Sequence, residues 1–294
     1  MNYAEINQAI LENRDVDESI IEKNDSFYIY LKNNKVAYYY SKFLSKRRTS
    51  QEVDIIEKGN KLNERFFESV NSIREICLSN NIRFLLYKTC KFIPEVVDGD
   101  IDMFIKPGDW HKFHAIYSKL GYTVRYDESG KSKVILPHLC TMEPHQNISW
   151  RGGNYLSEKF IWENTGLCTS MGVETASIEV ELSGLFAKVF FEPQYLDLYS
   201  LKLIKLFRQT ADFGSIKKNI EFNDAFEWLD DQINSLDYSK KMPYFIDSKH
   251  FLKFWTIICW RDRVWRNYCL HILYYFYWRT RYVLFDKLPF THDW

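Results

Sequence analysis

The chain is 294 residues long, of which 46% are hydrophobic and 17% aromatic, enough to fill one large domain or two ordinary ones. Basic and acidic residues balance at 39 each, so no overall field draws in nucleic acid or an anionic membrane. We therefore predict no extended nucleic-acid groove, because such a groove needs a basic surface. Eleven Gly and seven Pro are few for a loop-rich all-β fold.

The cysteines indicate the redox environment. Six of them occur without CxxC spacing or a paired framework, at positions 77, 90, 140, 168, 259 and 269. This pattern indicates reduced thiols, and we therefore expect a cytoplasmic protein. The first 17 residues are polar and acidic, which does not fit a signal peptide.

Helices are predicted over most of the first eighty residues. Apolar side chains recur at helical spacing within residues 1–50, and a second helix is predicted over about 51–79. A short strand over 82–87 follows. It ends at Lys88-Thr89-Cys90, where we expect the chain to turn from a strand into a helix.

Strands dominate the next part of the chain. The segment 100–105 alternates with period two, which places Ile101, Met103 and Ile105 on one face and Asp100, Asp102 and Phe104 on the other. A helix is predicted over 110–120, closed by Gly121. Further extended segments are expected over 122–126, over 133–136 and within 138–150.

The remaining chain, beyond about residue 156, is predicted to be mainly helical. Helices are expected over 178–208, interrupted near Pro193, over 222–233 and over 251–285. The last of these is aromatic but contains five arginines, at positions 261, 263, 266, 279 and 281. These charges exclude a membrane span. They form the edge of a core helix or line a phosphate-binding cleft, with binding at a membrane surface as a third interpretation.

These elements together predict an α/β (α+β) fold. A small mixed β-sheet of four or five strands is expected between N-terminal helices and a helical C-terminal region. The expected parts are an N-terminal helical region over 1–80, an α/β core over 81–165 and a C-terminal helical domain over 166–294.

Acidic side chains on the strand 100–105 suggest a metal site. Asp100 and Asp102 are ~7 Å apart along one face, and two carboxylates that close repel each other unless a cation bridges them. Oxygen ligands of this kind suit Mg²⁺ or Mn²⁺. Glu143 lies on a later extended segment and could join them as a third carboxylate, or it could be a cross-strand partner for one of the lysines. His145 is an acceptor contact, a neighbour of the ligands or a structural histidine.

Two further positions could meet an anionic substrate. At Lys88-Thr89 the backbone N–H groups could hold phosphate while the lysine supplies a point charge, although a surface lysine beside a capping threonine is an equally good interpretation. Arg151 could contact phosphate or be a solvated side chain.

The order and spacing of three motifs resemble the nucleotidyltransferase superfamily, whose fold is shared with DNA polymerase beta. These motifs are Lys88-Thr89, Asp100-Ile101-Asp102 and Glu143-Pro144-His145. They are most similar to an uncharacterised branch with a lysine-led turn, a DIDLLV strand and a later V-(D/E)-L-H strand. Leu120-Gly121-Tyr122 is similar to the ending of that branch's next helix. The resemblance covers about residues 82–165.

The resemblance implies particular roles for these residues. Asp100 and Asp102 would be metal ligands, Glu143 the third carboxylate, and Lys88 would lie near the triphosphate of an NTP. One feature departs from the pattern: the superfamily usually opens its site with Gly-Gly or Gly-Ser, whereas this chain has Lys88-Thr89-Cys90. The bulk of Cys90 falls where the backbone should approach phosphate.

Three functions are therefore considered. The first is a Mg²⁺- or Mn²⁺-dependent nucleotidyltransferase that moves NMP from ATP or another NTP to an unidentified acceptor. The second is a non-catalytic member of the same fold that binds a nucleotide or a partner, supported by the missing Gly-Gly or Gly-Ser. The third is a DxD glycosyltransferase, which would require a long alternating β/α half before the acidic strand.

Overall fold

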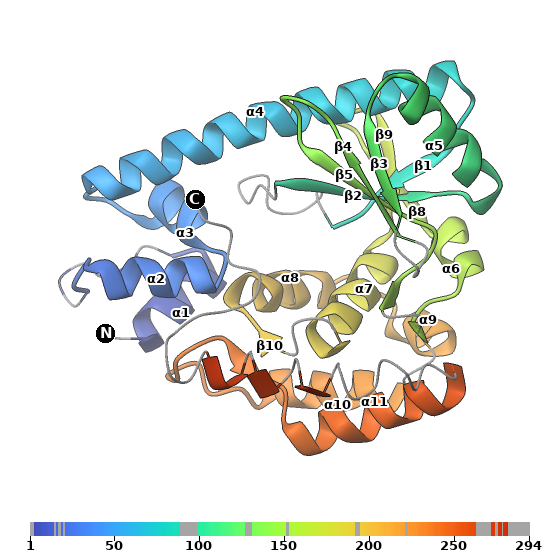
Figure 1. Cartoon of the computed structure of the whole chain (residues 1–294). Coiled ribbons are helices and arrows are strands. Elements are labelled where there is room, and N and C mark those ends of the chain that lie inside the picture. Colours follow the sequence, from blue (N-terminus) through green and yellow to red (C-terminus); the bar gives the residue numbers. More distant parts are fainter. Residues whose placement is uncertain are drawn as a thin grey trace. The chain divides into compact units, whose positions relative to one another are not determined.

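The computed structural model describes most of the chain. The described residues are 3–14, 16, 19, 21–88, 99–126, 131–150, 153–191, 195–220, 223–262, 272, 273, 276, 277 and 279–281. They fall into two compact units (Figure 1). The first unit comprises Met1–Lys58, Leu185–Thr210 and Phe222–Trp294, and the second comprises Gly59–Gly184 and Ala211–Glu221.

The first unit is mainly helical, as the sequence predicts for both ends of the chain. Its elements include α1 (Tyr3–Glu12), α2 (Asp25–Asn33), α3 (Ala37–Tyr39) with a π-helical turn (Tyr40–Leu44), α8 (Leu198–Arg208), α10 (Asn223–Asn234), α11 (Ser248–Asp262) and the pair β10 (Tyr195–Leu196) and β11 (Tyr244–Phe245). Pro193 and residues 263–271, with Arg263 and Arg266, lie outside the described residues. Within the described chain, every helix is too short or too polar to cross a bilayer.

The long helix α4 (Ser50–Ser79) starts at a capping box. The backbone N–H of Thr49 donates to the Glu52 carboxylate (2.7 Å), and the N–H of Glu52 donates to the Thr49 hydroxyl (3.2 Å). These bonds satisfy two N–H groups that a helix start otherwise leaves without partners. Lys23 lies 3.3 Å from the other carboxylate oxygen of the buried Glu52. The local sequence Thr-Ser-Gln-Glu therefore fixes where the helix predicted over 51–79 begins.

The second unit is built on a seven-stranded mixed sheet in the order β3-β4-β5-β2-β1-β9-β8 (Figure 1). The parallel pairs are β2 with β5 and β1 with β9, and the other neighbours are antiparallel. Its strands are β1 (Phe84–Leu86), β2 (Asp100–Ile105), β3 (Thr123–Tyr126), β4 (Ser132–Ile135), β5 (Thr141–His145), β8 (Thr165–Cys168) and β9 (Val173–Ala176). The predicted α/β fold class, with a mixed sheet and flanking helices, is confirmed.

The expectation of four or five strands is wrong. The additional strands β8 and β9 lie in a stretch that was expected to be mainly helical, and they form a hairpin that turns at Gly172 in the left-handed region (φ +61°). Each strand is four residues long, which is too short to show a clear period of two. The division of the chain at 80 and 165 stays a prediction.

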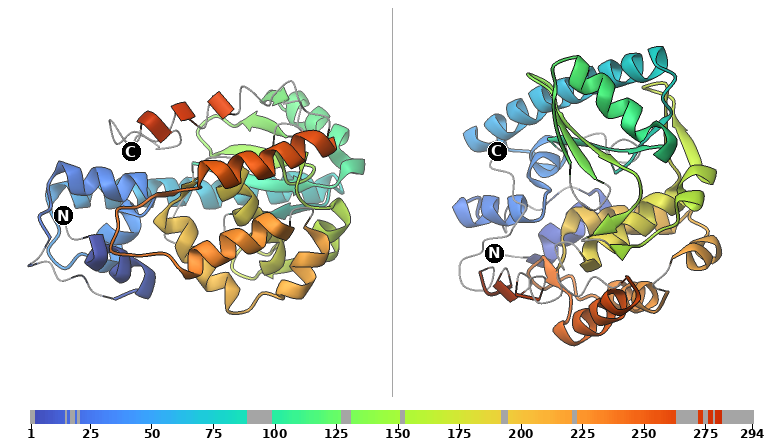
Figure 2. Two further views of the ribbon diagram at one scale, coloured as in Figure 1. Left: turned by 90° about the horizontal axis from the view of Figure 1, so that it is seen from below. Right: turned by 45° about the vertical axis from the view of Figure 1, so that its right-hand side comes forward.

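Helices cover the two faces of this sheet differently (Figure 2). Later turns of α4 and the helix α5 (Trp110–Lys119) pack on the face that carries Ile101, Met103 and Ile105. The first turns of α7 (Ile178–Phe191) lie against the other face, where Tyr87 contacts Gly184. The predicted alternation of the strand 100–105 is confirmed, and it directs the polar side chains of β2 toward the α7 side.

His114 of α5 should make the stability of the fold sensitive to acid. This buried imidazole donates from Nδ1 to the Trp110 carbonyl (2.8 Å) and accepts from the Ser132 hydroxyl at Nε2 (2.6 Å). Burial lowers the pKa of His114 and outweighs the hydrogen bond to Trp110, which raises it. The unfolded chain takes up this proton near pH 6.5, whereas the folded chain takes it up only at a lower pH. The free energy of unfolding should therefore decrease below pH ~6.5.

Denaturant titrations at about pH 7.5 and about pH 5.5 check this expectation. The free energy of unfolding should decrease less in His114→Gln, whose side chain does not titrate, than in the wild type. An equal decrease in the two proteins would show that another group controls the acid sensitivity.

Candidate active site

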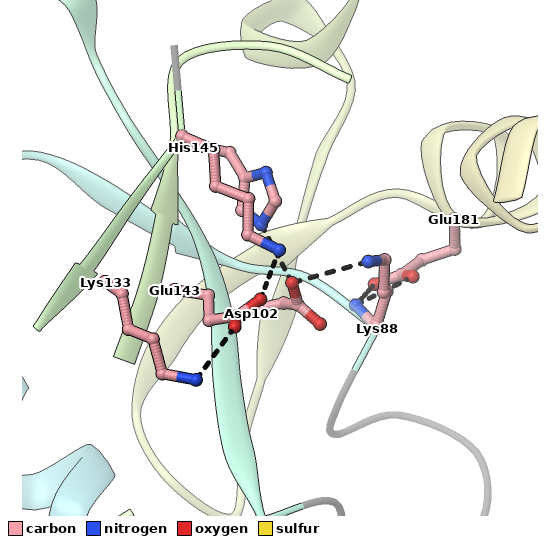
Figure 3. A network of polar contacts seen from close by, with 7 residues as sticks. Lys88, Asp102, Lys133, Glu143, His145 and Glu181 are labelled. Carbon is pink, nitrogen blue, oxygen red and sulfur yellow. Dashed lines mark hydrogen bonds and ion pairs between the residues drawn. The ribbon is translucent and has the colours of Figure 1, made fainter. Parts of the chain in front are cut away.

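The site forms where the two parallel strands β2 and β5 lie side by side. Their register places Asp102 directly opposite Glu143 and Phe104 opposite His145. Side chains at paired positions of neighbouring strands point to the same face, so both carboxylates project to the α7 side of the sheet. Asp102 is 6% exposed and His145 is 7% exposed. Figure 3 shows Asp102, Glu143 and His145 converging from the two strands.

Each carboxylate of this pair already has cationic or hydrogen-bonding partners. Asp102 Oδ1 accepts from His145 Nε2 (2.8 Å) and lies 3.3 Å from the Lys88 ammonium (Figure 3). Glu143 forms ion pairs with Lys131 and with Lys133, the latter at 3.6 Å. The interpretation of Glu143 as a cross-strand partner for lysines therefore describes this structure.

The surrounding charges set the protonation states. Burial raises the pKa of Asp102, but the charge of Lys88, the hydrogen bond from His145 and the charge of Lys131 together hold it below its usual value. Burial lowers the pKa of His145, and the positive charges of Lys88 and Lys131 lower it further. The hydrogen bond and the negative charge of Asp102 raise this pKa but compensate only in part. At neutral pH the site therefore contains an ionised aspartate beside a neutral imidazole.

Three side chains could hold a metal ion together. One ligand atom from each of Asp102, Glu143 and His145 lies within 4.8 Å of the others, and this is the one such group found in the part of the chain that the structure describes. Two carboxylates and a neutral imidazole fit a divalent cation, and the imidazole favours Mn²⁺ over Mg²⁺. Asp100, expected as a ligand, does not belong to this group. It is half-buried at the start of β2, opposite Thr141.

The end of β1 differs from the expected phosphate-binding turn. Lys88 adopts a left-handed conformation (φ +64°), and its backbone N–H donates to both carboxylate oxygens of Glu181 at 3.0 Å. In this structure Glu181 therefore accepts the Lys88 N–H, and phosphate binding at Lys88-Thr89 stays a prediction. The left-handed backbone at Lys88 directs its N–H toward the start of α7, where the Glu181 carboxylate accepts the hydrogen bond (Figure 3). Thr89 and Arg151 lie outside the described residues.

Three residues of the site were not predicted from the sequence. Lys131 and Lys133 are two positions apart around the start of β4, so they share one face, and this alternation was the available signal. Glu181 comes from a helix 93 positions beyond Lys88, and no local pattern marks it.

Comparison with known proteins gives little further information. No family model matches the chain, and no curated protein matches it. Among solved structures, the chain is similar to the solution structure of the antibiotic-resistance factor ANT(2'')-Ia. That likeness has a TM-score of 0.37 and 12% sequence identity, and it covers 57% of this chain and 96% of that chain.

Proposed function

We propose that the protein is a metal-dependent nucleotidyltransferase that moves NMP from an NTP to a hydroxyl or similar acceptor. The observation that carries this proposal is the pairing of Asp102 and Glu143 across two parallel strands, with His145 and Lys88 in direct contact with Asp102. The resemblance of the three sequence motifs to nucleotidyltransferases supports the same reaction class.

The donor set fits a divalent cation, Mg²⁺ or Mn²⁺. Asp102, Glu143 and His145 would hold it, because their oxygen and nitrogen atoms already lie close together on a largely buried surface. Asp100 stays in the proposal as a further ligand on the same strand face. A bound cation would supply positive charge for the phosphates and for the oxygen that attacks them.

The reaction is an in-line displacement at phosphorus. The acceptor oxygen forms a bond to the α-phosphorus, the bond from that phosphorus to the bridging oxygen breaks, and pyrophosphate leaves with the electron pair. The acceptor's proton is released to solvent, and Asp100, half-buried at the start of β2, keeps its proposed role as a cation ligand. Lys88 supplies a fixed ammonium near the phosphates, and Thr89 and Arg151 are the other proposed phosphate contacts. Catalysis then comes mainly from positioning and electrostatics.

A second candidate function is a non-catalytic nucleotide-binding protein of the same fold. Two observations favour it. Lysines already neutralise both carboxylates, and Glu181 occupies the Lys88 amide that a phosphate would otherwise receive. A protein of this kind would bind nucleotides without releasing pyrophosphate. The helical character of the chain before β1 gives no support to the DxD glycosyltransferase alternative.

An assay with NTPs labelled at the α-phosphate distinguishes these candidates. The wild type is incubated with each NTP, Mg²⁺ or Mn²⁺ and cell extract, and label transfer and pyrophosphate are followed together. We expect both signals to be equal, to disappear with a chelator, and to decrease by about 10²-fold or more in Glu143→Gln.

The matched control is Glu68→Gln, which makes the same exchange on an exposed turn of α4 and should leave transfer unchanged. Nucleotide binding without pyrophosphate release from any NTP would support the second candidate and reject the first.

A further inference from the structure

Lys131 and Lys133 form a pair, here named the lysine pair, on the face of the sheet that carries the acidic site. Lys131 forms a β-bridge with His145, and Lys133 lies opposite Arg125 of the edge strand β3. The ammonium groups of both lysines contact Glu143. The sheet therefore places a strip of positive charge directly beside the proposed metal ligands.

This arrangement opposes the binding of a free cation. Glu143 contributes one negative charge, and two ammonium groups already share its oxygens. A divalent ion on Glu143 would have to displace them and would then face their repulsion in a poorly hydrated site. Lys88 likewise forms an ion pair with Asp102, so lysines already neutralise both carboxylates in the protein without a bound metal.

If a cation displaced Lys131 and Lys133 from Glu143, their ammonium groups would need another anionic partner. The Lys131 side chain is only 28% exposed, so water cannot fully replace its ion pair. The negative charge of a triphosphate is sufficient to pair with both lysine ammonium groups and with the Arg125 guanidinium on the neighbouring strand, since lysine and arginine are common phosphate ligands. A metal–triphosphate complex satisfies the carboxylates and the lysines at once.

We propose that Lys131 and Lys133 are triphosphate ligands that exchange Glu143 for the phosphates of the incoming nucleotide. The site then binds a divalent cation and a triphosphate together, and binds the cation alone weakly. This inference deepens the proposed function and rests on its metal and nucleotide site, although it does not require that transfer occurs.

The test measures equilibrium binding by calorimetry with two probes. The first is Mn²⁺ alone, and the second is Mn²⁺ with an ATP analogue that carries a methylene group between its α- and β-phosphates and cannot be cleaved there. In the wild type the analogue should bind with Mn²⁺ at least ~10-fold more tightly than without it. In Lys131→Met/Lys133→Met the two affinities should change in opposite directions: Mn²⁺ alone should bind ~3–10-fold more tightly, and the analogue ~10-fold or more weakly.

The control variant Lys119→Met removes an exposed lysine from α5, on the opposite face of the sheet, and should leave both affinities unchanged. If the double variant does not fold, the single variant Lys133→Met replaces it, since the native Lys133 side chain is 48% exposed. Its two affinities should change in the same opposite directions, by smaller factors. Affinities that decrease together, or that do not change, would overturn the proposal. Opposite changes in a protein without transfer activity would reject the catalytic function and keep this inference.

Discussion

Replacement of Asp102 with asparagine should lower nucleotidyl transfer by about 10³-fold or more. Asparagine has nearly the same shape and can still accept the hydrogen bond from His145, so the geometry of β2 and β5 should survive. It removes the negative charge, which a divalent cation requires and which balances Lys88. Transfer of label from an NTP labelled at the α-phosphate measures the loss.

The same variant needs a check of its folding, because Lys88 is left without its anionic partner at 3.3 Å. Circular dichroism and a denaturant titration should show a folded protein of somewhat lower stability. Glu68→Gln again serves as the exposed charge-removing control. A folded Asp102→Asn protein with wild-type transfer would exclude Asp102 as a metal ligand and reject the proposed mechanism.

Replacement of Gly184 with alanine should destabilise the second unit by about 2 kcal/mol or more. A Cβ at this position would lie 1.6 Å from the Tyr87 hydroxyl oxygen and 2.6 Å from the ring carbon that carries it, so the whole ring must move. Tyr87 is 2% exposed and packs on Phe104, with ring centroids 4.6 Å apart, which leaves it little space. Alanine improves helix propensity by roughly 1 kcal/mol, which is less than the expected cost of overpacking.

Urea titration of Gly184→Ala measures this effect. Gly108→Ala is the matched control, since a Cβ there meets nothing within 4 Å, and it should be as stable as the wild type. Because Tyr87 directly precedes Lys88, we also expect Gly184→Ala to lose transfer by moving the lysine away from Asp102. Wild-type stability in Gly184→Ala would mean that α7 does not pack on Tyr87 as described.

Local patterns predicted the elements of this fold that have a clear period. The alternation of residues 100–105, the helix over 110–120 and its closure at Gly121, which is left-handed with φ +84°, are all present. The hairpin of β8 and β9 was missed because each strand is too short for its period to be visible. An element is predictable from the sequence where its own residues are numerous enough to show the period of a helix or a strand.

The candidate site depends on longer-range information. The residue types and the facing direction of Asp102 and Glu143 follow from strand alternation, but their register becomes visible only when β2 and β5 pair. The contact of Glu181 with the Lys88 amide depends on how α7 packs at the end of β1. Such contacts are set by tertiary packing across many residues, and no local pattern encodes them.

The left-handed conformation of Lys88 has a consequence for evolution and for engineering. At φ +64° a residue with a Cβ is strained by about 1 kcal/mol relative to glycine, which adopts this region readily. Selection for thermal tolerance alone would therefore favour glycine at this position. A lysine at position 88 makes the fold less stable than a glycine would, but it places an ammonium group 3.3 Å from Asp102. A redesign that optimises backbone conformation alone would therefore replace Lys88 with glycine and remove this ammonium group.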